Sequence, residues 1–143
     1  MSLVSSSGYA HVRLTVTDIA RSKAFYDQVF GWPAAIDQTA EVDDPRTQGE
    51  PGNYYGGVIY ATPQGTLFGL RPVGEQTFDS EHTGLDHVSF MVESRSDLER
   101  AAAHFDEAGI VHGEILDFAD SGLAVLSFQD PDDINIELTA PLG

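Results

Sequence analysis

A repeated opening pattern constrains what this chain can fold into more than any other feature. Residues 11–16 read HVRLTV, and residues 87–92 read HVSFMV. Each segment is short, begins with a histidine and alternates apolar with mostly polar side chains, as a half-buried β-strand does. Side chains in a strand alternate between its two faces. The repeat therefore predicts two similar modules, each opening on a strand whose histidine lies opposite the apolar side chains.

A helix is predicted after each of these strands. The first covers Asp18–Phe30, and Gly31 is expected to end it. The second covers Ser96–Ala108, with Gly109 after its end, and Ser96 has the spacing of a capping box with the glutamate three positions later. Both segments carry apolar side chains at helical spacing, which indicates that one face of each helix packs on a sheet.

Three further strands are predicted after each helix. They cover Ala34–Val42, Gly56–Ala61 and Thr66–Arg71 in the first half, and Gly113–Phe118, Ala124–Gln129 and Asn135–Thr139 in the second. Turn-forming residues separate the last two strands of each half. We therefore predict one α+β domain over residues 1–143, with two tandem βαβββ modules at residues 9–71 and 85–140 and a linker at residues 72–84.

Each predicted module leaves one face of its sheet uncovered, because a single helix covers only one side of a four-stranded sheet. Two such sheets side by side are expected to form a curved, cup-shaped sheet of mixed antiparallel and parallel strands. The helices would lie outside and a cleft inside. The two modules of the cup are expected from one chain, with a swap between two chains as the other arrangement.

Three side chains suited to metal binding are predicted on the cleft face. His11 and His87 open the equivalent strands, and Glu137 lies between Ile136 and Leu138 on the last strand. A histidine at a strand start is most often hydrogen-bonded locally, and a glutamate on a terminal strand most often faces water. The equivalent positions of the two histidines favour a shared site, since two histidines and a carboxylate with open positions suit Fe(II), Mn(II) and similar ions.

Composition narrows the classes of function. The chain has 23 acidic residues against 7 Lys and Arg, and its formal net charge of −16 disfavours binding to nucleic acids. It has no cysteine, so a metal would have to be held by His, Asp or Glu. No apolar run is long enough to span a membrane, and neither nucleic acid nor membrane is an expected partner. We expect a cytoplasmic protein that acts on a small molecule.

Four further residues are predicted to contact the substrate. Arg13, Ser89 and Asn135 alternate onto the cleft faces of their strands, and Arg71 ends another strand. Arginine binds a carboxylate or phosphate through two parallel hydrogen bonds. Pairing with one of the many acidic side chains nearby is the other interpretation of both arginines.

No motif identifies a catalytic residue. Tyr54 and Tyr60, with Tyr55 beside them, are candidates for proton donation near the cleft. Packing with a solvated hydroxyl is the commoner role of such tyrosines. The polar segment Asp43–Asn53 before them is interpreted either as a flexible surface loop or as a lid over the cleft.

Three segments resemble the vicinal oxygen chelate superfamily, which includes glyoxalase I, extradiol dioxygenases, and fosfomycin- and bleomycin-resistance proteins. They are HVRLTVTDIARSKAFYDQVFGW (11–32), GLDHVSFMV (84–92) and FQDPDDINIEL (128–138). The resemblance implies the fold of paired modules and a divalent metal ion, one of Fe, Mn, Zn, Ni or Mg, held at up to four positions. His11, His87 and Glu137 match three of these positions, and Gly69 stands at the fourth.

The resemblance also implies a range of activities. Glyoxalase I is expected to need a carboxylate where this chain has Gly69, whereas a His, His, Glu set resembles that of extradiol dioxygenases, which usually have longer chains. We therefore expect a metal-dependent enzyme acting on a small oxygen-chelating substrate, of the dioxygenase or the lyase/isomerase type. The alternative is a metal-free protein that binds a small molecule, as antibiotic-sequestering members do. A homodimer is usual in the superfamily and is expected here.

Overall fold

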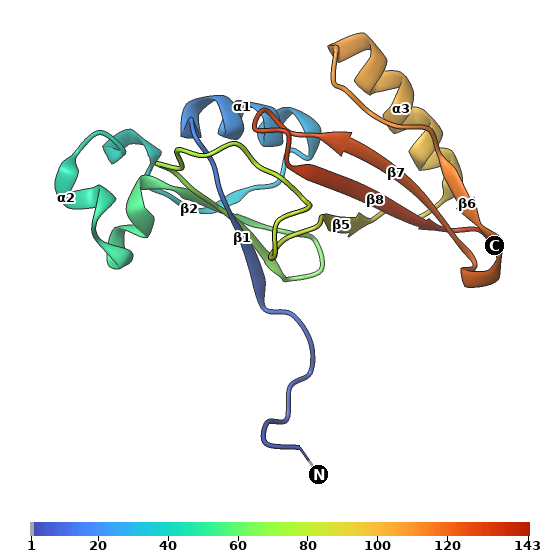
Figure 1. Ribbon diagram of the computed structural model, residues 1–143, viewed down its shortest axis with the longest axis horizontal. Coiled ribbons are helices and arrows are strands. Elements are labelled where there is room, and N and C mark those ends of the chain that lie inside the picture. The colour runs from blue at the N-terminus through green and yellow to red at the C-terminus, as the bar shows by residue number, and fades with distance from the viewer. Residues whose placement is uncertain (1) are drawn as a thin grey trace. The chain divides into compact units, whose positions relative to one another are not determined.

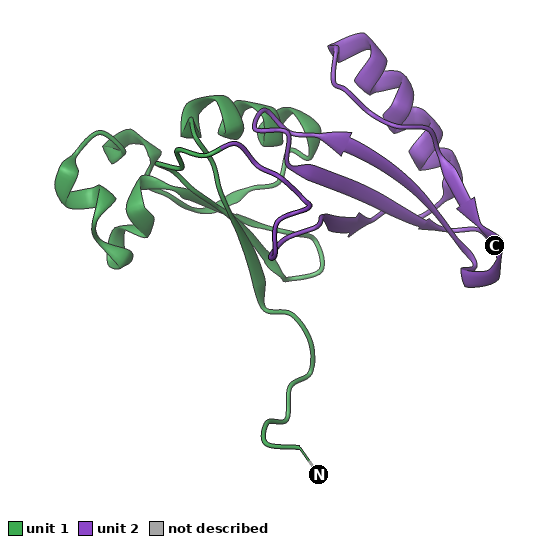
Figure 2. Ribbon diagram, viewed as in Figure 1, with its two compact units in different colours: residues 1–76 green, residues 77–143 purple. Residues whose placement is uncertain are grey.

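The computed structural model of the chain describes residues 2–143. The chain divides into two compact units, Met1–Gln76 and Thr77–Gly143 (Figure 2). The boundary between them falls inside the predicted linker at residues 72–84. A single domain over residues 1–143 stays a prediction, as does the cup-shaped pairing of the two sheets.

The first unit is a four-stranded mixed sheet with one long helix against it (Figure 1). Its strands lie in the order β1-β4-β3-β2, with β1 parallel to β4 and the other neighbours antiparallel. Three short helices connect β2 to β3. The elements are β1 (His11–Thr15), α1 (Ile19–Val29), β2 (Ala34–Asp37), η1 (Thr39–Glu41), α2 (Pro45–Gln48), η2 (Pro51–Gly56), β3 (Val58–Ala61) and β4 (Leu67–Arg71).

The second unit repeats this topology. Its strands lie in the order β5-β8-β7-β6, with β5 parallel to β8 and the other neighbours antiparallel. The elements are β5 (Val88–Met91), α3 (Arg95–Ala108), β6 (Leu116–Phe118), η3 (Ala119–Ser121), β7 (Leu123–Gln129) and β8 (Asn135–Pro141). The prediction of an α+β fold with two tandem βαβββ modules is confirmed.

Two strands, β2 and β6, are shorter than predicted by three or more residues. β2 ends at Asp37 rather than Val42, because the Asp37 carboxylate accepts hydrogen bonds from the backbone N–H and the hydroxyl of Thr39, at 2.9 and 2.6 Å, and the chain turns into η1. β6 begins at Leu116 rather than Gly113, and the residues before it form only an isolated bridge from His112 to β7.

The start of α3 also differs from the prediction. Ser94 caps the helix, and its backbone N–H donates to Asp97 Oδ2 at 2.9 Å. The predicted capping box between Ser96 and Glu99 is therefore wrong by two residues. The cause is the adjacent run of Ser and Asp side chains, which offers more than one start at capping-box spacing.

The core of the first unit lies between α1 and one face of its sheet. Alternate positions of β1, β3 and β4 supply its buried side chains, which are Leu14, Val58, Tyr60, Phe68 and Leu70. Tyr26 of α1 packs edge-on against Phe68, with ring centroids 5.1 Å apart. The opposite face of β1 carries His11, Arg13 and Thr15, all of them exposed. The alternation of side chains predicted for this strand is confirmed.

The core of the second unit lies between α3 and its own sheet. Phe105 of α3 packs on Phe128 of β7, with ring centroids 4.6 Å apart, and Ile136 and Leu138 of β8 are buried on the same face. Glu137 alternates onto the other face. α3 is the longest helix at 14 residues, and within residues 2–143 no helix is long and apolar enough to cross a membrane.

Candidate functional site

The free face of the second sheet brings together two of the three predicted metal ligands. His87 directly precedes β5, and Glu137 lies on β8, where it pairs with Ser89. His87 Nε2 lies 3.7 Å from Glu137 Oε1. This separation is too long for a hydrogen bond. Glu137 is mostly shielded, with 17% of its side chain exposed, whereas His87 is 43% exposed and reachable from solvent.

Asp86 fixes the orientation and the tautomer of the His87 ring. The Asp86 carboxylate lies 2.6 Å from His87 Nδ1. An ionised carboxylate only accepts hydrogen bonds, so in the neutral imidazole Nδ1 carries the proton and Nε2 keeps its lone pair. Metal-binding histidines are typically oriented by such a carboxylate. Sequence analysis missed this residue, although a carboxylate directly before His87 was a signal for it.

The separation of His87 and Glu137 fits a shared metal ion. Nitrogen and oxygen ligands lie about 2.0–2.2 Å from ions such as zinc. Two atoms 3.7 Å apart can therefore both reach one ion without moving. The donor set of one imidazole and one carboxylate is the borderline-hard type that Fe(II), Mn(II) and Zn(II) accept.

The predicted substrate-binding residues of the second unit surround this pair. Ser89 Oγ lies 2.5 Å from Thr139 Oγ1, and that hydroxyl lies 3.4 Å from Glu137 Oε1. Asn135 Nδ2 donates to the Asp86 backbone oxygen at 3.3 Å. Ser89 and Asn135 therefore belong to a hydrogen-bonded frame that holds Glu137 and Asp86, and contact with a substrate stays a prediction for both.

His11, the third predicted ligand, lies on β1 in the first unit. Among residues 2–143, no group of three or more His, Asp or Glu side chains is placed to hold one metal ion. The His11, His87, Glu137 set therefore stays a prediction, and the structure places two of its members, His87 and Glu137, close together.

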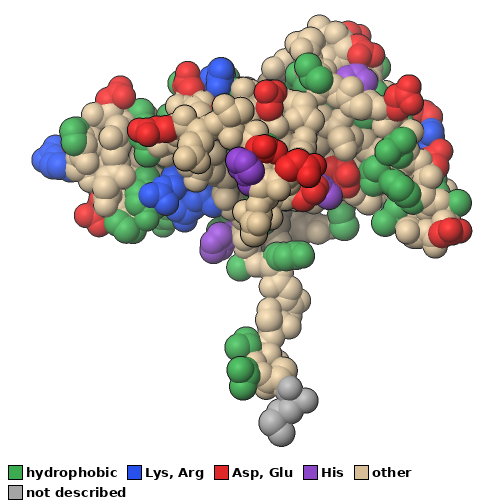
Figure 3. Space-filling model, viewed as in Figure 1, with side chains coloured by type: hydrophobic (Ala, Val, Ile, Leu, Met, Phe, Trp, Pro, Cys, Tyr) green, Lys and Arg blue, Asp and Glu red, His purple; other side chains and the backbone are tan. Residues whose placement is uncertain are grey.

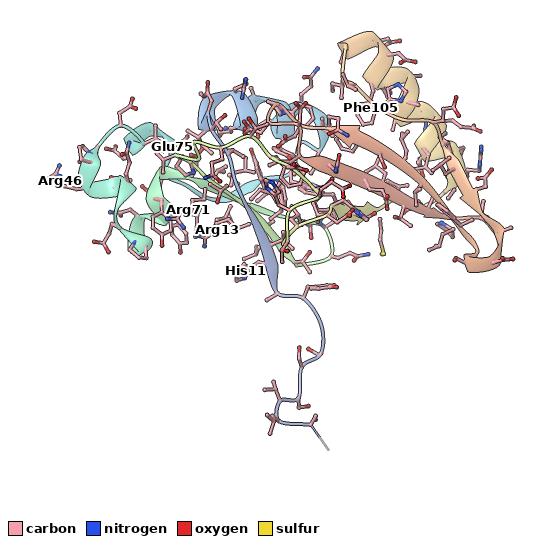
Figure 4. All side chains as sticks on the ribbon, in the orientation of Figure 1. His11, Arg13, Arg46, Arg71, Glu75 and Phe105 are labelled. Atoms are coloured by element: carbon pink, nitrogen blue, oxygen red, sulfur yellow. The ribbon has the colours of Figure 1, made fainter. Side chains whose placement is uncertain are left out.

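The free face of the first sheet carries basic rather than acidic side chains. Figure 4 shows His11, Arg13 and Arg71 on the same side of the first unit. Arg13 pairs with Gly69, and Thr15 pairs with Arg71, so the two arginines are diagonal neighbours on adjacent parallel strands. Lys and Arg side chains form a patch on this unit in the space-filling view (Figure 3).

Gly69 occupies the position in the first unit that Glu137 occupies in the second. Arg13 follows His11 by two residues and pairs with Gly69, and Ser89 follows His87 by two residues and pairs with Glu137. The strand registers thus confirm the equivalence expected from the sequence. The first unit has no carboxylate at the position where the resemblance implies a fourth metal ligand.

Tyr55 links the two arginines. The guanidinium carbon of Arg71 lies 3.9 Å from the centroid of the Tyr55 ring, and that of Arg13 lies 6.0 Å from it. Both distances are within the range of cation–π contacts. Tyr55 lies 42 residues from Arg13 and 16 from Arg71 in the chain, so no local sequence signal predicted these contacts.

The segment that carries Tyr55 is held tightly. Tyr54 and Tyr55 both have left-handed backbones, with φ of 52° and 58°. A non-glycine residue in this region costs on the order of 1–3 kcal/mol and persists only when its surroundings impose it. At the next two positions, a Cβ on Gly56 would lie 2.7 Å from Val42 Cα, and one on Gly57 would lie 2.1 Å from the Leu70 oxygen. Close packing on β4 and on residue 42 fixes the tyrosines, and the preceding polar segment contains α2 and the start of η2.

Tyr60 lies on the other side of the sheet. It is 1% exposed, and its hydroxyl donates to Asp27 Oδ1 of α1 at 2.8 Å. Burial, followed by the hydrogen bond to Asp27, raises the pKa of the Tyr60 phenol well above its usual value. These contacts assign its hydroxyl a place in the core. A catalytic role for Tyr54 or Tyr60 stays a prediction.

Solved structures share this architecture. A glyoxylase/bleomycin resistance protein/dioxygenase domain from Frankia sp. EAN1pec is 27% identical, with a TM-score of 0.76, and the match covers 96% of this chain and 93% of that one. The fosfomycin resistance protein FosX from Listeria monocytogenes is 15% identical, with a TM-score of 0.68 and coverage of 95% and 94%. Lactoylglutathione lyase from Agrobacterium tumefaciens is 17% identical, with a TM-score of 0.67 and coverage of 94% of each chain.

A comparison with curated proteins found no match. The family model for the glyoxalase/bleomycin resistance protein/dioxygenase superfamily matches residues 8–138, which include the first module, all but the end of the second, and all three predicted metal ligands. That superfamily includes enzymes. Together with the two βαβββ modules, this match shows that the chain belongs to the glyoxalase/bleomycin resistance protein/dioxygenase superfamily.

Proposed function

We propose that the protein is a metal-dependent enzyme acting on a small oxygen-chelating substrate, of the dioxygenase or the lyase/isomerase type. The ligands would be His87 and Glu137, with His11 as the third. One observation carries the proposal: His87 Nε2 and Glu137 Oε1 face each other at 3.7 Å while Asp86 occupies the other ring nitrogen.

The residues of the second unit have distinct roles in this proposal. Asp86 accepts a hydrogen bond from Nδ1–H of His87 and so keeps the Nε2 lone pair available. Thr139 lies 3.4 Å from Glu137 Oε1 and limits the rotation of the carboxylate. A bound divalent ion would supply Lewis-acid stabilisation of an oxyanion that develops on the substrate. In the first unit, Arg13 and Arg71 are proposed to bind an anionic part of the substrate.

Gly69 disfavours one activity within the superfamily. The resemblance implies a carboxylate at this position in glyoxalase I, and glycine supplies no ligand. The proposal therefore favours reactions that a site with two histidines and one carboxylate can support, with positions left open for two substrate oxygens.

The second candidate function is metal-free binding of a small molecule. It is favoured by one observation: among residues 2–143, no third metal-binding side chain accompanies His87 and Glu137. In that case the exposed imidazole and the shielded carboxylate would contact the ligand directly by hydrogen bonds.

Elemental analysis separates the two functions. The protein would be purified anaerobically, without a His-tag or added metal, beside the variants His87→Ala, Glu137→Gln and His11→Ala. His82→Ala is the matched control, because His82 is also 3.5 Å from a carboxylate, that of Asp79, but is 79% exposed and is no predicted ligand.

The proposal predicts close to one metal ion per chain in the wild type and in the control. It predicts at least a tenfold lower metal content in His87→Ala and Glu137→Gln, since each removes a ligand. The result for His11→Ala decides whether it is the third ligand. A wild type that holds no metal even after reconstitution with Fe(II), Mn(II), Zn(II), Ni(II) and Mg(II) would refute the proposal and leave metal-free binding.

A further inference from the structure

We propose that the first unit carries a site for a small oxyanion, a carboxylate or phosphate group, formed by Arg13 and Arg71 and braced by Tyr55. This site deepens the proposed function, in which Arg13 and Arg71 bind an anionic part of the substrate, by adding Tyr55 and naming the anion class. It rests on that role of the arginines but not on a bound metal ion, because all three residues belong to one unit and none is a predicted metal ligand. Its ligand is defined by chemistry: a compact anion with two or more oxygens able to accept from guanidinium groups.

The pattern of ion pairs points to these two arginines. The chain has 23 acidic residues and only 7 Lys and Arg, so an exposed basic side chain without a carboxylate partner is unexpected. Lys23, Arg46, Arg95 and Arg100 all form ion pairs at hydrogen-bonding distance with Asp or Glu. Among residues 2–143, neither Arg13 nor Arg71 has a carboxylate oxygen within ion-pairing distance, although both are exposed. The fold thus keeps two positive charges side by side and unneutralised.

Stacking on Tyr55 orients the Arg71 guanidinium so that it can bind an anion. The Arg71 guanidinium lies over the ring at 3.9 Å, so one of its faces is covered. Its N–H groups lie in the plane of the guanidinium and remain free to bind two oxygens of one ligand. The guanidinium carbon of Arg13 lies 6.0 Å from the centroid of the same ring, so both arginines are within cation–π range of Tyr55.

The backbone beneath the arginines supports the same conclusion. Gly69 pairs with Arg13 and lies two residues before Arg71 on β4, and a Cβ there would lie 3.3 Å from Arg13 Cγ. Glycine therefore lets the Arg13 side chain lie across β4. Tyr55 is held in a left-handed backbone conformation by the packing of Gly56 and Gly57. The ring that braces the arginines is a fixed part of the unit.

Binding of inorganic phosphate and of acetate tests the site directly. Isothermal titration would use full-length protein freed of metal with 1,10-phenanthroline, a neutral chelator that does not compete for an anion site. The variants are Arg13→Gln, Arg71→Gln, Arg71→Lys and Tyr55→Leu. Arg46→Gln is the control: it removes the same charge from a side chain that is 91% exposed and already paired with Asp44 at 2.9 Å. Figure 4 shows Arg46 apart from Arg13 and Arg71.

The proposal predicts saturable binding of at least one probe. The probe that binds more tightly identifies the anionic group of the ligand as a phosphate or a carboxylate. Arg13→Gln and Arg71→Gln should each weaken binding at least tenfold, and Arg46→Gln should leave it within twofold. Arg71→Lys should also weaken binding, because it keeps the charge but loses the planar fork. No saturable binding of either probe would overturn the proposal, as would an equal loss in Arg46→Gln.

The outcome is independent of the proposed metal function. The titration uses metal-free protein, and its variants leave His87 and Glu137 unchanged. A protein that binds metal but neither anion would retain the metal proposal and lose the anion site. A protein that binds an anion but no metal would retain the anion site alone.

Discussion

Replacement of Tyr60 by phenylalanine should destabilise the first unit through the loss of one hydrogen bond. The Tyr60 hydroxyl donates to Asp27 Oδ1 at 2.8 Å and ties β3 to α1. Hydrogen bonds to charged groups contribute about 1.5–3 kcal/mol to stability. Asp27 keeps Lys23 at 2.9 Å and is 44% exposed, so water can partly replace the lost donor. We therefore expect the low end of that range, about 1.5 kcal/mol.

The assay is urea unfolding followed by the fluorescence of Trp32. This is the only tryptophan, and it stacks on Phe30 with ring centroids 4.1 Å apart, so its signal reports the first unit. Tyr9→Phe is the matched control, because Tyr9 is 90% exposed and should change the unfolding free energy by less than about 0.5 kcal/mol. A Tyr60→Phe variant as stable as this control would refute the reasoning that the buried hydroxyl acts structurally.

Three further outcomes are expected. Asp86→Asn should lower metal affinity about 10- to 100-fold without loss of folding, measured by competition with a chelator. The neutral amide is a weaker acceptor and can also donate, so it no longer fixes the proton on Nδ1 of His87. Gly57→Ala should destabilise the protein by about 3 kcal/mol or more in urea unfolding, since its Cβ would lie 2.1 Å from the Leu70 oxygen, whereas Gly52→Ala meets nothing within 4 Å and should be nearly neutral. The Asp106 side chain, then the Gly113 carbonyl, raises the pKa of His112, so this pair stabilises the fold fully below the unfolded pKa of about 6.5 and less as pH rises through the folded pKa. His112→Gln should therefore lower the free energy of unfolding more at pH 5.5 than at pH 8, by under about 1 kcal/mol because Asp106 is exposed. An equal loss of stability at the two pH values would contradict this expectation.

The sequence predicted the two modules because the core obeys local rules. Alternation in HVRLTV placed His11 and Arg13 opposite the buried Leu14, and the registers confirm that Gly69 and Glu137 are equivalent. Errors arose where a short polar side chain competes with regular structure, as at Asp37, which ends β2 by accepting two hydrogen bonds from Thr39.

Contacts that depend on tertiary placement were beyond sequence reasoning. Tyr55 reaches Arg13 and Arg71 only because two consecutive residues adopt left-handed backbones, which no propensity favours for tyrosine. Tyr60 was a plausible proton donor from its position in the chain. The alternation of β3 instead buries it against α1.

The absence of a carboxylate at residue 69 and the free charge on Arg13 are two aspects of one feature. Equivalent registers carry Ser89 with Glu137 in the second unit and Arg13 with Gly69 in the first. A side chain on Gly69 would begin 3.3 Å from Arg13 Cγ, so a carboxylate there would lie within reach of the Arg13 guanidinium. It would pair with that cation and neutralise it. The first unit can therefore offer a carboxylate ligand or an unpaired Arg13 at this position, and this sequence has the second. The same duplicated fold thus presents a metal-type donor pair in one module and a basic face in the other.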